Sequence, residues 1–256
     1  MSLRPLYLEP GIAWQVKLDA GVALHVAAPG RTRVLVPLSR LARVVCDARA
    51  SWETGALLAC LAAGVPVTFH DARGSAVAWC FGPRRRETTL ASLLRLGLDH
   101  PEWPERYPLW RAAVARREIE AALNTARLPA RACDGAAARA ALCNHHRERL
   151  GRPAGALLRA LQQATAGLAA EALEHIVCDP QLLAYPRPGL NLVAELAGLL
   201  EWRIHRLIAR TPAARLADTR LGRLAAALVE SNDGPLHRAC GEILGDLEFN
   251  LREWLL

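Results

Sequence analysis

The sequence predicts an α+β fold, in which a small strand-rich N-terminal domain is followed by a larger all-helical domain. Two observations carry this prediction. Up to residue 82, short apolar runs alternate with turn signals, whereas beyond it long segments rich in alanine and leucine follow a helical period. Because 52% of the 256 residues are hydrophobic, each domain can bury a core of its own.

The N-terminal domain, residues 1–82, is expected to be built on short strands. Strands are predicted wherever a run of apolar and β-branched residues ends at a Gly, Pro or Asp turn signal: residues 12–18, 22–27, 33–36, 42–46, 65–70 and 76–81. One helix interrupts them. Ser51 is the expected N-cap of this helix, apolar residues recur on one face between residues 57 and 62, and Gly64 ends it.

The C-terminal domain, residues 83–256, is expected to be helical nearly throughout. Segments with helical spacing predict helices at residues 88–98, 110–126, 135–150, 153–178, 188–208, 221–229 and 235–254. Pro153, Pro188 and Pro235 each stand at the start of one of these segments. Proline is tolerated there because the N–H groups of a first turn have no helical partner.

Composition narrows the classes of function. The formal net charge is +7, which is typical of proteins that bind polyanions such as nucleic acids. No apolar run is as long as the roughly 18 residues of a membrane span, and the N-terminus lacks the apolar segment of a signal peptide, so a cytoplasmic protein without membrane contact is expected. The seven cysteines form no CxxC pair and no glycine-rich phosphate loop occurs, which argues against a zinc ribbon, a disulfide framework and ATP dependence.

Basic residues gather in the first half of the helical domain, and almost all of them are arginine, which binds phosphate through a planar bidentate fork. Trp103, Tyr107 and Trp110 are expected in a loop among them, where they could stack on an end base. The alternative is a solvated helix face over buried tryptophans. A surface that tracks the DNA backbone is predicted from the following residues: Arg84, Arg85, Arg86, Arg111, Arg116, Arg117 and Arg139.

Residues 37–83 contain a strand, a helix, the strand GVPVTF and the turn DARG before a last strand. Further along, the motifs DGAAAR, RPAGALL, DPQLLAY and LVAELAG occur. In the order and spacing of their motifs these segments resemble the CRISPR-associated spacer integrase, the larger subunit of the adaptation complex. The resemblance covers about residues 10–205. The resemblance implies that the N-terminal domain serves in dimerisation and that the helical domain carries a metal and DNA site.

The resemblance also implies four active-site positions. The glutamate of the family motif E-G-x-x-A-R corresponds to Asp134, the histidine of D-P-x-x-G-F-H to Tyr185, and the two acids of L-x-x-D-L-x-E to Glu195 and Gly198. Cutting or joining a DNA strand requires a divalent cation such as Mg²⁺ or Mn²⁺, which prefers oxygen ligands. Because a tyrosine with an ordinary pKa of about 10 is neutral at pH 7 and glycine has no side chain, we expect at most weak metal binding, through Asp134 and Glu195.

Each of these residues also has a simpler explanation. Asp134 could merely cap the helix that follows it. Tyr185, beside two prolines, could pack on the helical domain as a loop residue. Glu195 could form a salt bridge, since an unpaired charge on an apolar helix face is costly.

Other residues could form a replacement metal site. Glu201 and His205 share a helix face at i,i+4 spacing, although a solvated pair has the same spacing. His145 and His146 are adjacent, so they diverge around their helix and cannot both face one ion.

These observations leave three functions open. The first is a DNA-binding subunit of a CRISPR adaptation complex with an impaired catalytic site, which binds double-stranded DNA as a homodimer or together with an active integrase paralogue and the small partner subunit. The second is an active metal-dependent endonuclease or integrase, with a site rearranged around Asp134 and Glu195. The third is a protein-binding module that docks through the acidic residues of its C-terminal helix: Glu242, Asp246, Glu248 and Glu253.

Overall fold

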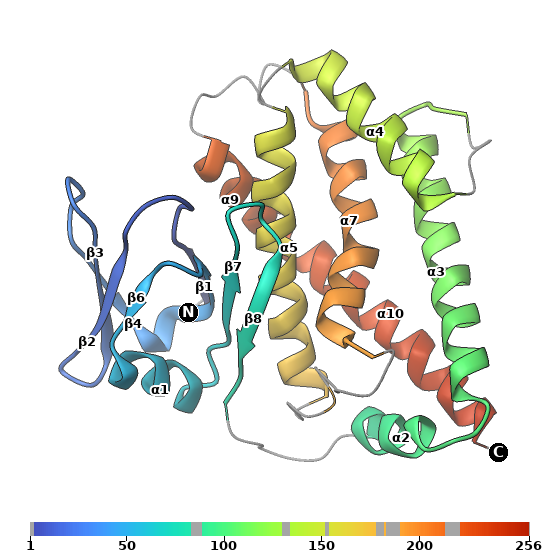
Figure 1. Cartoon of the computed structure of the whole chain (residues 1–256), viewed down its shortest axis with the longest axis horizontal. Coiled ribbons are helices and arrows are strands. Elements are labelled where there is room, and N and C mark those ends of the chain that lie inside the picture. The colour runs from blue at the N-terminus through green and yellow to red at the C-terminus, as the bar shows by residue number, and fades with distance from the viewer. Residues whose placement is uncertain are drawn as a thin grey trace.

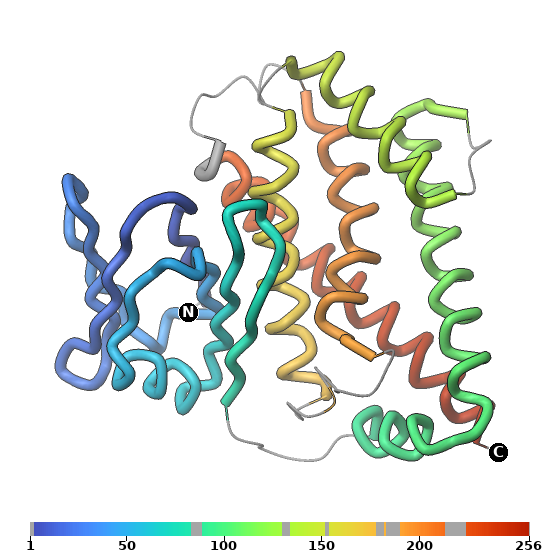
Figure 2. The backbone as a smooth tube through the Cα atoms, viewed as in Figure 1, coloured from blue at the N-terminus to red at the C-terminus, as the bar shows by residue number. Residues whose placement is uncertain are grey.

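The computed structural model describes residues 3–82, 89–129, 134–151, 154–177, 182, 190–212 and 221–255. A strand-rich N-terminal region lies beside a larger region of long helices (Figure 1), so the α+β prediction is confirmed. Figure 2 follows the chain from the sheets to the C-terminal helix, which ends on the side of the helical region away from the sheets. Among the described residues, no helix is both long enough and apolar enough to cross a bilayer.

The N-terminal region contains two four-stranded sheets. The first sheet has the order β1 (Arg4–Tyr7), β5 (Leu41–Asp47), β7 (Val67–His70) and β8 (Ala76–Cys80). The second has the order β4 (Val34–Pro37), β3 (Ala23–Ala27), β2 (Gln15–Asp19) and β6 (Ser51–Trp52). A short 3₁₀ helix (Leu38–Arg40) leads into β5, and helix α1 (Thr54–Ala62) leads into β7.

The helix expected from Ser51 begins later than predicted. Ser51 lies in β6, where its backbone N–H donates to the carbonyl of Trp14 at 2.8 Å, and α1 begins at Thr54 after Glu53 at the N-cap. Pairing with β2 therefore overrides the capping tendency of serine, and this pairing depends on residues far along the chain. Strand β1 was also missed, because its short run gives no clear period.

The helical region contains α2 (Thr89–Leu98), α3 (Trp103–Thr125), α4 (Gly135–Leu150), α5 (Ala154–Ile176), α7 (Leu192–Arg210), α9 (Leu221–Ser231) and α10 (Asp233–Trp254). Helix α5 packs against α7, α9 and the first sheet, and it is the element around which the others are arranged (Figure 1). Helix α7 begins later than expected, with the Asn191 side chain accepting from the Ala194 N–H at 3.0 Å. The predicted first-turn residues Pro153 and Pro188 lie outside the described residues.

Helix α3 begins at Trp103, so the tryptophan-bearing loop expected there is wrong. Trp103, Tyr107 and Trp110 are buried in the core, and the first two rings stack at a centroid distance of 4.5 Å. These residues recur at i, i+4 and i+7, so one helix face carries all three rings into the core despite Pro108 within the helix. The proposed stacking of DNA bases on them is therefore also wrong, and the alternative of buried tryptophans is confirmed.

Helix α10 is part of the same core and is not a free docking arm. Its apolar face is buried through residues such as Leu244, Leu247 and Leu251. Two of its acidic side chains form contacts within the chain: Asp246 accepts from Trp110 Nε1 at 2.9 Å, and Glu242, 65% exposed, lies 3.4 Å from Arg203. Protein binding through the exposed acidic residues of this helix stays a prediction.

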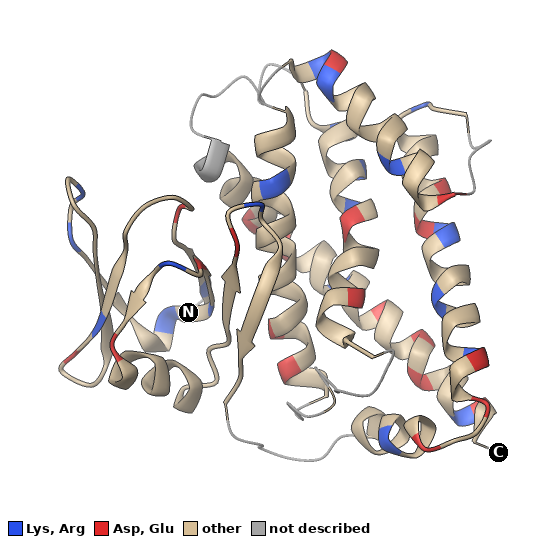
Figure 3. Cartoon of the chain, in the orientation of Figure 1, with Lys and Arg blue, Asp and Glu red and all other residues tan. Residues whose placement is uncertain are grey.

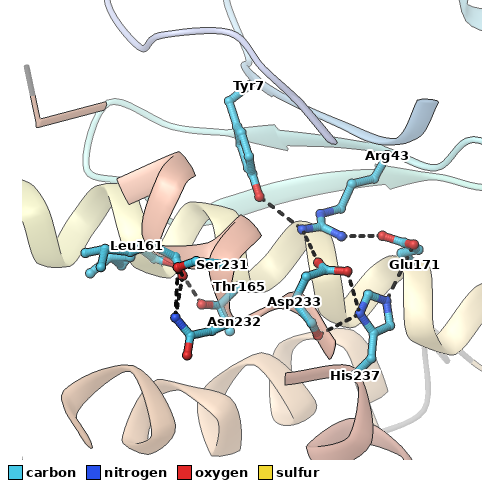
Figure 4. A network of polar contacts seen from close by, with 10 residues as sticks. Tyr7, Arg43, Leu161, Thr165, Glu171, Ser231, Asn232, Asp233 and His237 are labelled. Atoms are coloured by element: carbon cyan, nitrogen blue, oxygen red, sulfur yellow. Dashed lines mark hydrogen bonds and ion pairs between the residues drawn. The ribbon is translucent and has the colours of Figure 1, made fainter. Parts of the chain in front are cut away.

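A buried ion-pair network joins the first sheet to α5 and α10 (Figure 4). The guanidinium of Arg43, whose side chain is 1% exposed, donates to the carboxylate of Glu171, to the Tyr7 hydroxyl at 3.0 Å and to Asp233 Oδ1 at 3.2 Å. His237 lies between the same acids, with Nε2 3.5 Å from Glu171 and Nδ1 3.2 Å from Asp233. Two cationic and two anionic groups thus compensate each other where strand and helices meet.

The close approach of α5 to β5 requires a glycine. A Cβ atom on Gly167 would lie 2.4 Å from Val45 Cγ2, far inside van der Waals contact. Along β5, Arg43 and Val45 face α5, while Val44 and Cys46 belong to the core shared by the two sheets. Every residue of β5 is buried because both faces of the strand are covered.

The network predicts a pH-dependent stability. Hydrogen bonds to Asp233 and then Glu171 raise the pKa of His237 to about 10, against the lowering effect of its burial. In the unfolded chain this pKa is about 6.5, so the stabilisation by His237 is complete below pH 6.5 and is lost as the pH rises towards 10. We expect His237→Gln to destabilise the protein in urea at pH 6 and to matter progressively less towards pH 10. If the free energies of unfolding of wild type and His237→Gln differ by the same amount at every pH, the raised pKa of His237 is not what stabilises the protein.

Candidate metal and nucleic-acid site

Asp134 caps the N-terminus of α4. Its carboxylate accepts hydrogen bonds from the backbone N–H groups of Ala136 at 3.1 Å and Ala137 at 3.4 Å. These donors have no partner within the helix, so the contact satisfies groups that would otherwise stay unpaired. The alternative that Asp134 is an N-cap is confirmed, and this role engages both of its oxygens.

Glu195 projects from the first turn of α7 towards α3. One carboxylate oxygen accepts a hydrogen bond from the Tyr107 hydroxyl, and the other accepts from Arg111 Nη1 at 3.0 Å. Burial raises the pKa of Glu195, while Tyr107 and Arg111 act in the opposite direction. Burial and then the neighbouring Glu195 also raise the pKa of Tyr107, which therefore stays neutral and donates. The salt-bridge alternative for Glu195 is confirmed.

The other two positions that the resemblance implies, Tyr185 and Gly198, provide no described metal ligand. Gly198 has no side chain, and no atom lies within 4 Å of the position that a Cβ would occupy. Tyr185 lies outside the described residues. Within the described part of the chain, no group of three His, Cys, Asp or Glu side chains is arranged to hold a metal ion. The donors at Asp134 and Glu195, each held by other protein groups, therefore do not fit a cation site of the kind that the resemblance implies.

Glu201 is held by a cation of the protein. Its oxygens accept from Arg139 Nε and Nη2 at 3.0 Å each, and from Gln162 Nε2 at 2.9 Å. Burial raises the pKa of Glu201, but His205 and Arg139 outweigh this effect and lower it to about 2. Arg139 also lies over the ring of Trp202, 5.2 Å from its centroid. The expected alternative of a Glu201–His205 metal pair is thus replaced by an arginine fork that bridges α4 and α7.

A buried histidine pair lies behind this fork. His146 Nε2 and His205 Nδ1 are 3.1 Å apart, and neither residue is exposed to solvent. Burial, followed by the neighbouring His205, lowers the pKa of His146 to about 3, so it is neutral at pH 7. His145 is only partly buried, as expected for an adjacent residue that diverges around the helix. The pairing of α4 with α7 through histidines could not be read from the sequence, since the two residues are 59 positions apart.

The predicted DNA-binding arginines fall into three groups. Arg84, Arg85 and Arg86 lie outside the described residues. Arg111 and Arg139 are anchored on buried carboxylates, with side chains 49% and 47% exposed. Arg116 and Arg117 are exposed on α3 and have no salt bridge within the described part of the chain. Figure 3 shows basic residues distributed along α3, α4 and α7.

A pocket of about 340 Å³ lies beside Gly198, between α7, α5 and the turn that joins β7 to β8. Gln162 and Glu201 contribute polar groups to its wall, whereas Trp79 and several alanines contribute apolar surface. The sequence indicated the acidic positions on α7 but not this pocket. Its walls come from three segments that are distant along the chain.

Comparisons with known proteins identify the fold. No protein-family model and no curated protein matches the sequence. Among solved structures, the CAS1 protein TM1797 from Thermotoga maritima superposes with a TM-score of 0.71 at 12% identity, over 97% of each chain.

The chain has the Cas1 fold. The Cas1 chain of a TtCas1–DNA complex superposes with a TM-score of 0.56 at 15% identity, over 98% of this chain and 91% of that one. A chain of a Cas6-RT-Cas1–Cas2 complex gives a TM-score of 0.67 at 13% identity, with 98% of this chain matching 35% of that much longer chain. The resemblance to the CRISPR-associated integrases is thereby confirmed at the level of the fold.

The cap role of Asp134 predicts which replacements are tolerated. Asp134→Ala should lower the free energy of unfolding by about 1 kcal/mol, because two N–H groups of α4 lose their acceptor. Asp134→Asn should have nearly the stability of the wild type, since asparagine caps equally well without a charge. Urea unfolding of the three proteins measures both effects. Equal destabilisation by alanine and asparagine would show that the charge, and not the cap, is what the residue contributes.

Proposed function

We propose that this chain is a DNA-binding subunit of a CRISPR adaptation complex, in which the integrase fold is retained and the catalytic site is impaired. The observation that carries the proposal is that, in a Cas1 fold, the carboxylates of Asp134 and Glu195 are bound by other groups of the protein. Asp134 is engaged by backbone N–H groups and Glu195 by Tyr107 and Arg111. Gly198 supplies no ligand to complete a site with them.

Cutting or joining DNA is a phosphoryl transfer, which requires a bound divalent cation. A divalent cation acts as a Lewis acid on the phosphate and positions the nucleophile, and Mg²⁺ or Mn²⁺ would have to draw on Asp134 and Glu195. To bind there, the ion would have to displace the N–H donors from Asp134 and the cation Arg111 from Glu195. With few ligands and a competing positive charge, the site would bind such an ion weakly and orient it poorly.

Binding to double-stranded DNA is supported by charge. The net charge is +7, and exposed arginines such as Arg116 and Arg117 have no acidic partner in the described structure. The solved relatives include a Cas1–DNA complex and a Cas1–Cas2 complex. By analogy, we propose that this chain acts in the cytoplasm as a homodimer through its N-terminal region, or with an active integrase paralogue, and that it contacts the small partner subunit.

The alternative is an active Mg²⁺- or Mn²⁺-dependent endonuclease or integrase with a rearranged site. The open pocket beside Gly198 favours this reading, since it leaves room for a ligand or a substrate group close to α7. In this case Asp134 or Glu195 would have to exchange its present partner for the metal.

Activity with Mn²⁺ distinguishes the two readings. We expect the purified protein to bind labelled duplex or overhang DNA without cleaving or joining it above background. We also expect Glu195→Ala to leave Mn²⁺ titration calorimetry unchanged, because the wild type has no competent site to lose. An active Cas1 protein serves as the positive control. Strand transfer or cleavage that disappears in Asp134→Ala or Glu195→Ala would reject the impaired site in favour of the enzyme.

The dependence of DNA affinity on salt tests the basic surface. Each phosphate contact contributes about 0.9 to the slope of log K against log salt for duplex DNA. The triple variant Arg84→Ala/Arg85→Ala/Arg86→Ala should therefore have a slope lower by about 2.7 if all three arginines contact phosphates. The matched control removes three exposed cations of the N-terminal region, Lys17, Arg33 and Arg40. A slope that changes as little in the first variant as in this control would locate the DNA surface elsewhere.

A further inference from the structure

Arg111 holds its guanidinium against an acid for which the resemblance implies a metal. Its Nη1 donates to Glu195 Oε1 at 3.0 Å, and its side chain is 49% exposed, whereas that of Glu195 is 14% exposed. The guanidinium therefore has one side against a largely buried carboxylate and the other side towards solvent. The charge beside Glu195 is supplied by the protein itself, and it is accessible to a ligand from outside.

The aromatic core of α3 fixes the carboxylate that orients Arg111. The Tyr107 hydroxyl donates to Glu195 Oε2, and the ring of Tyr107 stacks on that of Trp103 at a centroid distance of 4.5 Å. Both aromatic residues are buried. Glu195 is thus held by a neutral donor on one oxygen, which leaves its other oxygen for Arg111. The long arginine side chain is thereby ordered before any ligand binds, which lowers the entropy cost of binding.

One edge of the Arg111 guanidinium is unoccupied within the described part of the chain. Only Nη1 has a partner there, so the edge formed by Nε and Nη2 has no acceptor. Two other arginines of the helical region use this same edge. Arg139 donates through Nε and Nη2 to Glu201. Arg203 donates through the same two atoms to Glu118. Their forks are filled by carboxylates, whereas the fork of Arg111 is open, and such a planar fork also matches two oxygens of a phosphate.

We propose that Arg111 binds a phosphate of duplex DNA through its open Nε–Nη2 edge, in the place of a divalent cation. Glu195 and Tyr107 are positioning residues, because Glu195 holds the guanidinium by its other nitrogen and Tyr107 holds Glu195. Arginine provides the charge of a cation but no coordination position for an attacking hydroxyl, so the contact binds DNA without activating a nucleophile. The inference rests on the proposed DNA-binding function and names the group that replaces the metal at Glu195.

A double-mutant cycle on Arg111 and Glu195 tests the proposal. The four proteins are the wild type, Arg111→Ala, Glu195→Gln and the double variant, and their affinity for one labelled blunt duplex is measured by fluorescence anisotropy at several salt concentrations. Arg111→Ala should lower the affinity about tenfold, as expected for a charge-assisted hydrogen bond. It should also lower the salt slope by about 0.9, the value of one phosphate contact in duplex DNA. The same two losses should separate the double variant from Glu195→Gln.

The cycle distinguishes a phosphate contact from mere neutralisation of Glu195. If Arg111 only shields the DNA from this acid, Arg111→Ala weakens binding by leaving a negative charge uncompensated, and the loss disappears when Glu195→Gln is also present. The double variant contains no buried acid without a partner, so it folds even if Arg111→Ala alone is unstable. The control Arg40→Ala removes the same charge from an exposed position in the N-terminal region, and it should keep nearly the wild-type affinity.

Replacement of the metal is tested on the wild type alone. Its affinity for the duplex should be the same in EDTA as in Mn²⁺ at equal ionic strength, because Arg111 and not an added ion contacts the phosphate. An affinity that rises with Mn²⁺ would show that an ion from solution still makes this contact.

Three results would overturn the role of Arg111. They are a loss of affinity confined to proteins that retain Glu195, an Arg111→Ala variant that behaves like Arg40→Ala, and tighter binding of the wild type in Mn²⁺. In each of them the wild type still binds the duplex, so the proposed DNA-binding function stands. Wild-type protein that does not bind the duplex at low salt would overturn both.

Discussion

The ion pair between Arg43 and Glu171 is the contact on which the arrangement of the whole molecule depends. Arg43 is a charged side chain on a fully buried strand, and its charge is acceptable only because Glu171 on α5 and Asp233 on α10 lie against it. Removing one partner of such a pair leaves a buried charge, which typically costs about 3–5 kcal/mol. The pair thus fixes the place of α5 on the first sheet, and the pocket beside Gly198 has walls from both of these elements.

The same electrostatic rule operates inside the helical region. Glu118 accepts hydrogen bonds from Arg203 Nε at 2.9 Å and Arg203 Nη2 at 2.7 Å. Glu195 is bound by Arg111, and Glu201 by Arg139. A carboxylate among apolar helices has to be compensated by hydrogen bonds and an opposite charge. In a metal-dependent enzyme a cation can provide this compensation, whereas here arginines from α3, α4 and α7 provide it. The arginine partners of these acids and the weak metal binding that we propose would thus be two consequences of one requirement.

The parts of this arrangement that follow from local patterns were predictable. Strand and helix periods located most elements, and an aspartate ahead of an alanine-rich helix allowed the N-cap role of Asp134. Elsewhere tertiary contacts made the local prediction wrong. Ser51 pairs with the distant strand β2 instead of capping a helix. Helix α3 begins at Trp103 and runs through Pro108, with its aromatic rings packed in the core. The Arg139–Glu201 fork joins residues 62 positions apart. No local pattern contains such a contact, so Arg139 was predicted only as a DNA contact, whereas its guanidinium binds the carboxylate of Glu201.

The incomplete ligand set that we propose would not by itself disturb the fold, for a physical reason. Clustered carboxylates repel one another unless an ion lies between them, so a complete set of acids on α4 and α7 would destabilise the protein whenever the metal was absent. A glycine at position 198 adds no such repulsion, and the packing of α7 does not depend on this position because a Cβ there would have no neighbour within 4 Å. The fold depends instead on the leucine-rich core and on paired charges such as Arg43–Glu171, none of which involve Asp134, Glu195 or Gly198. An impaired metal site, as we propose it, is therefore compatible with retention of the Cas1 fold.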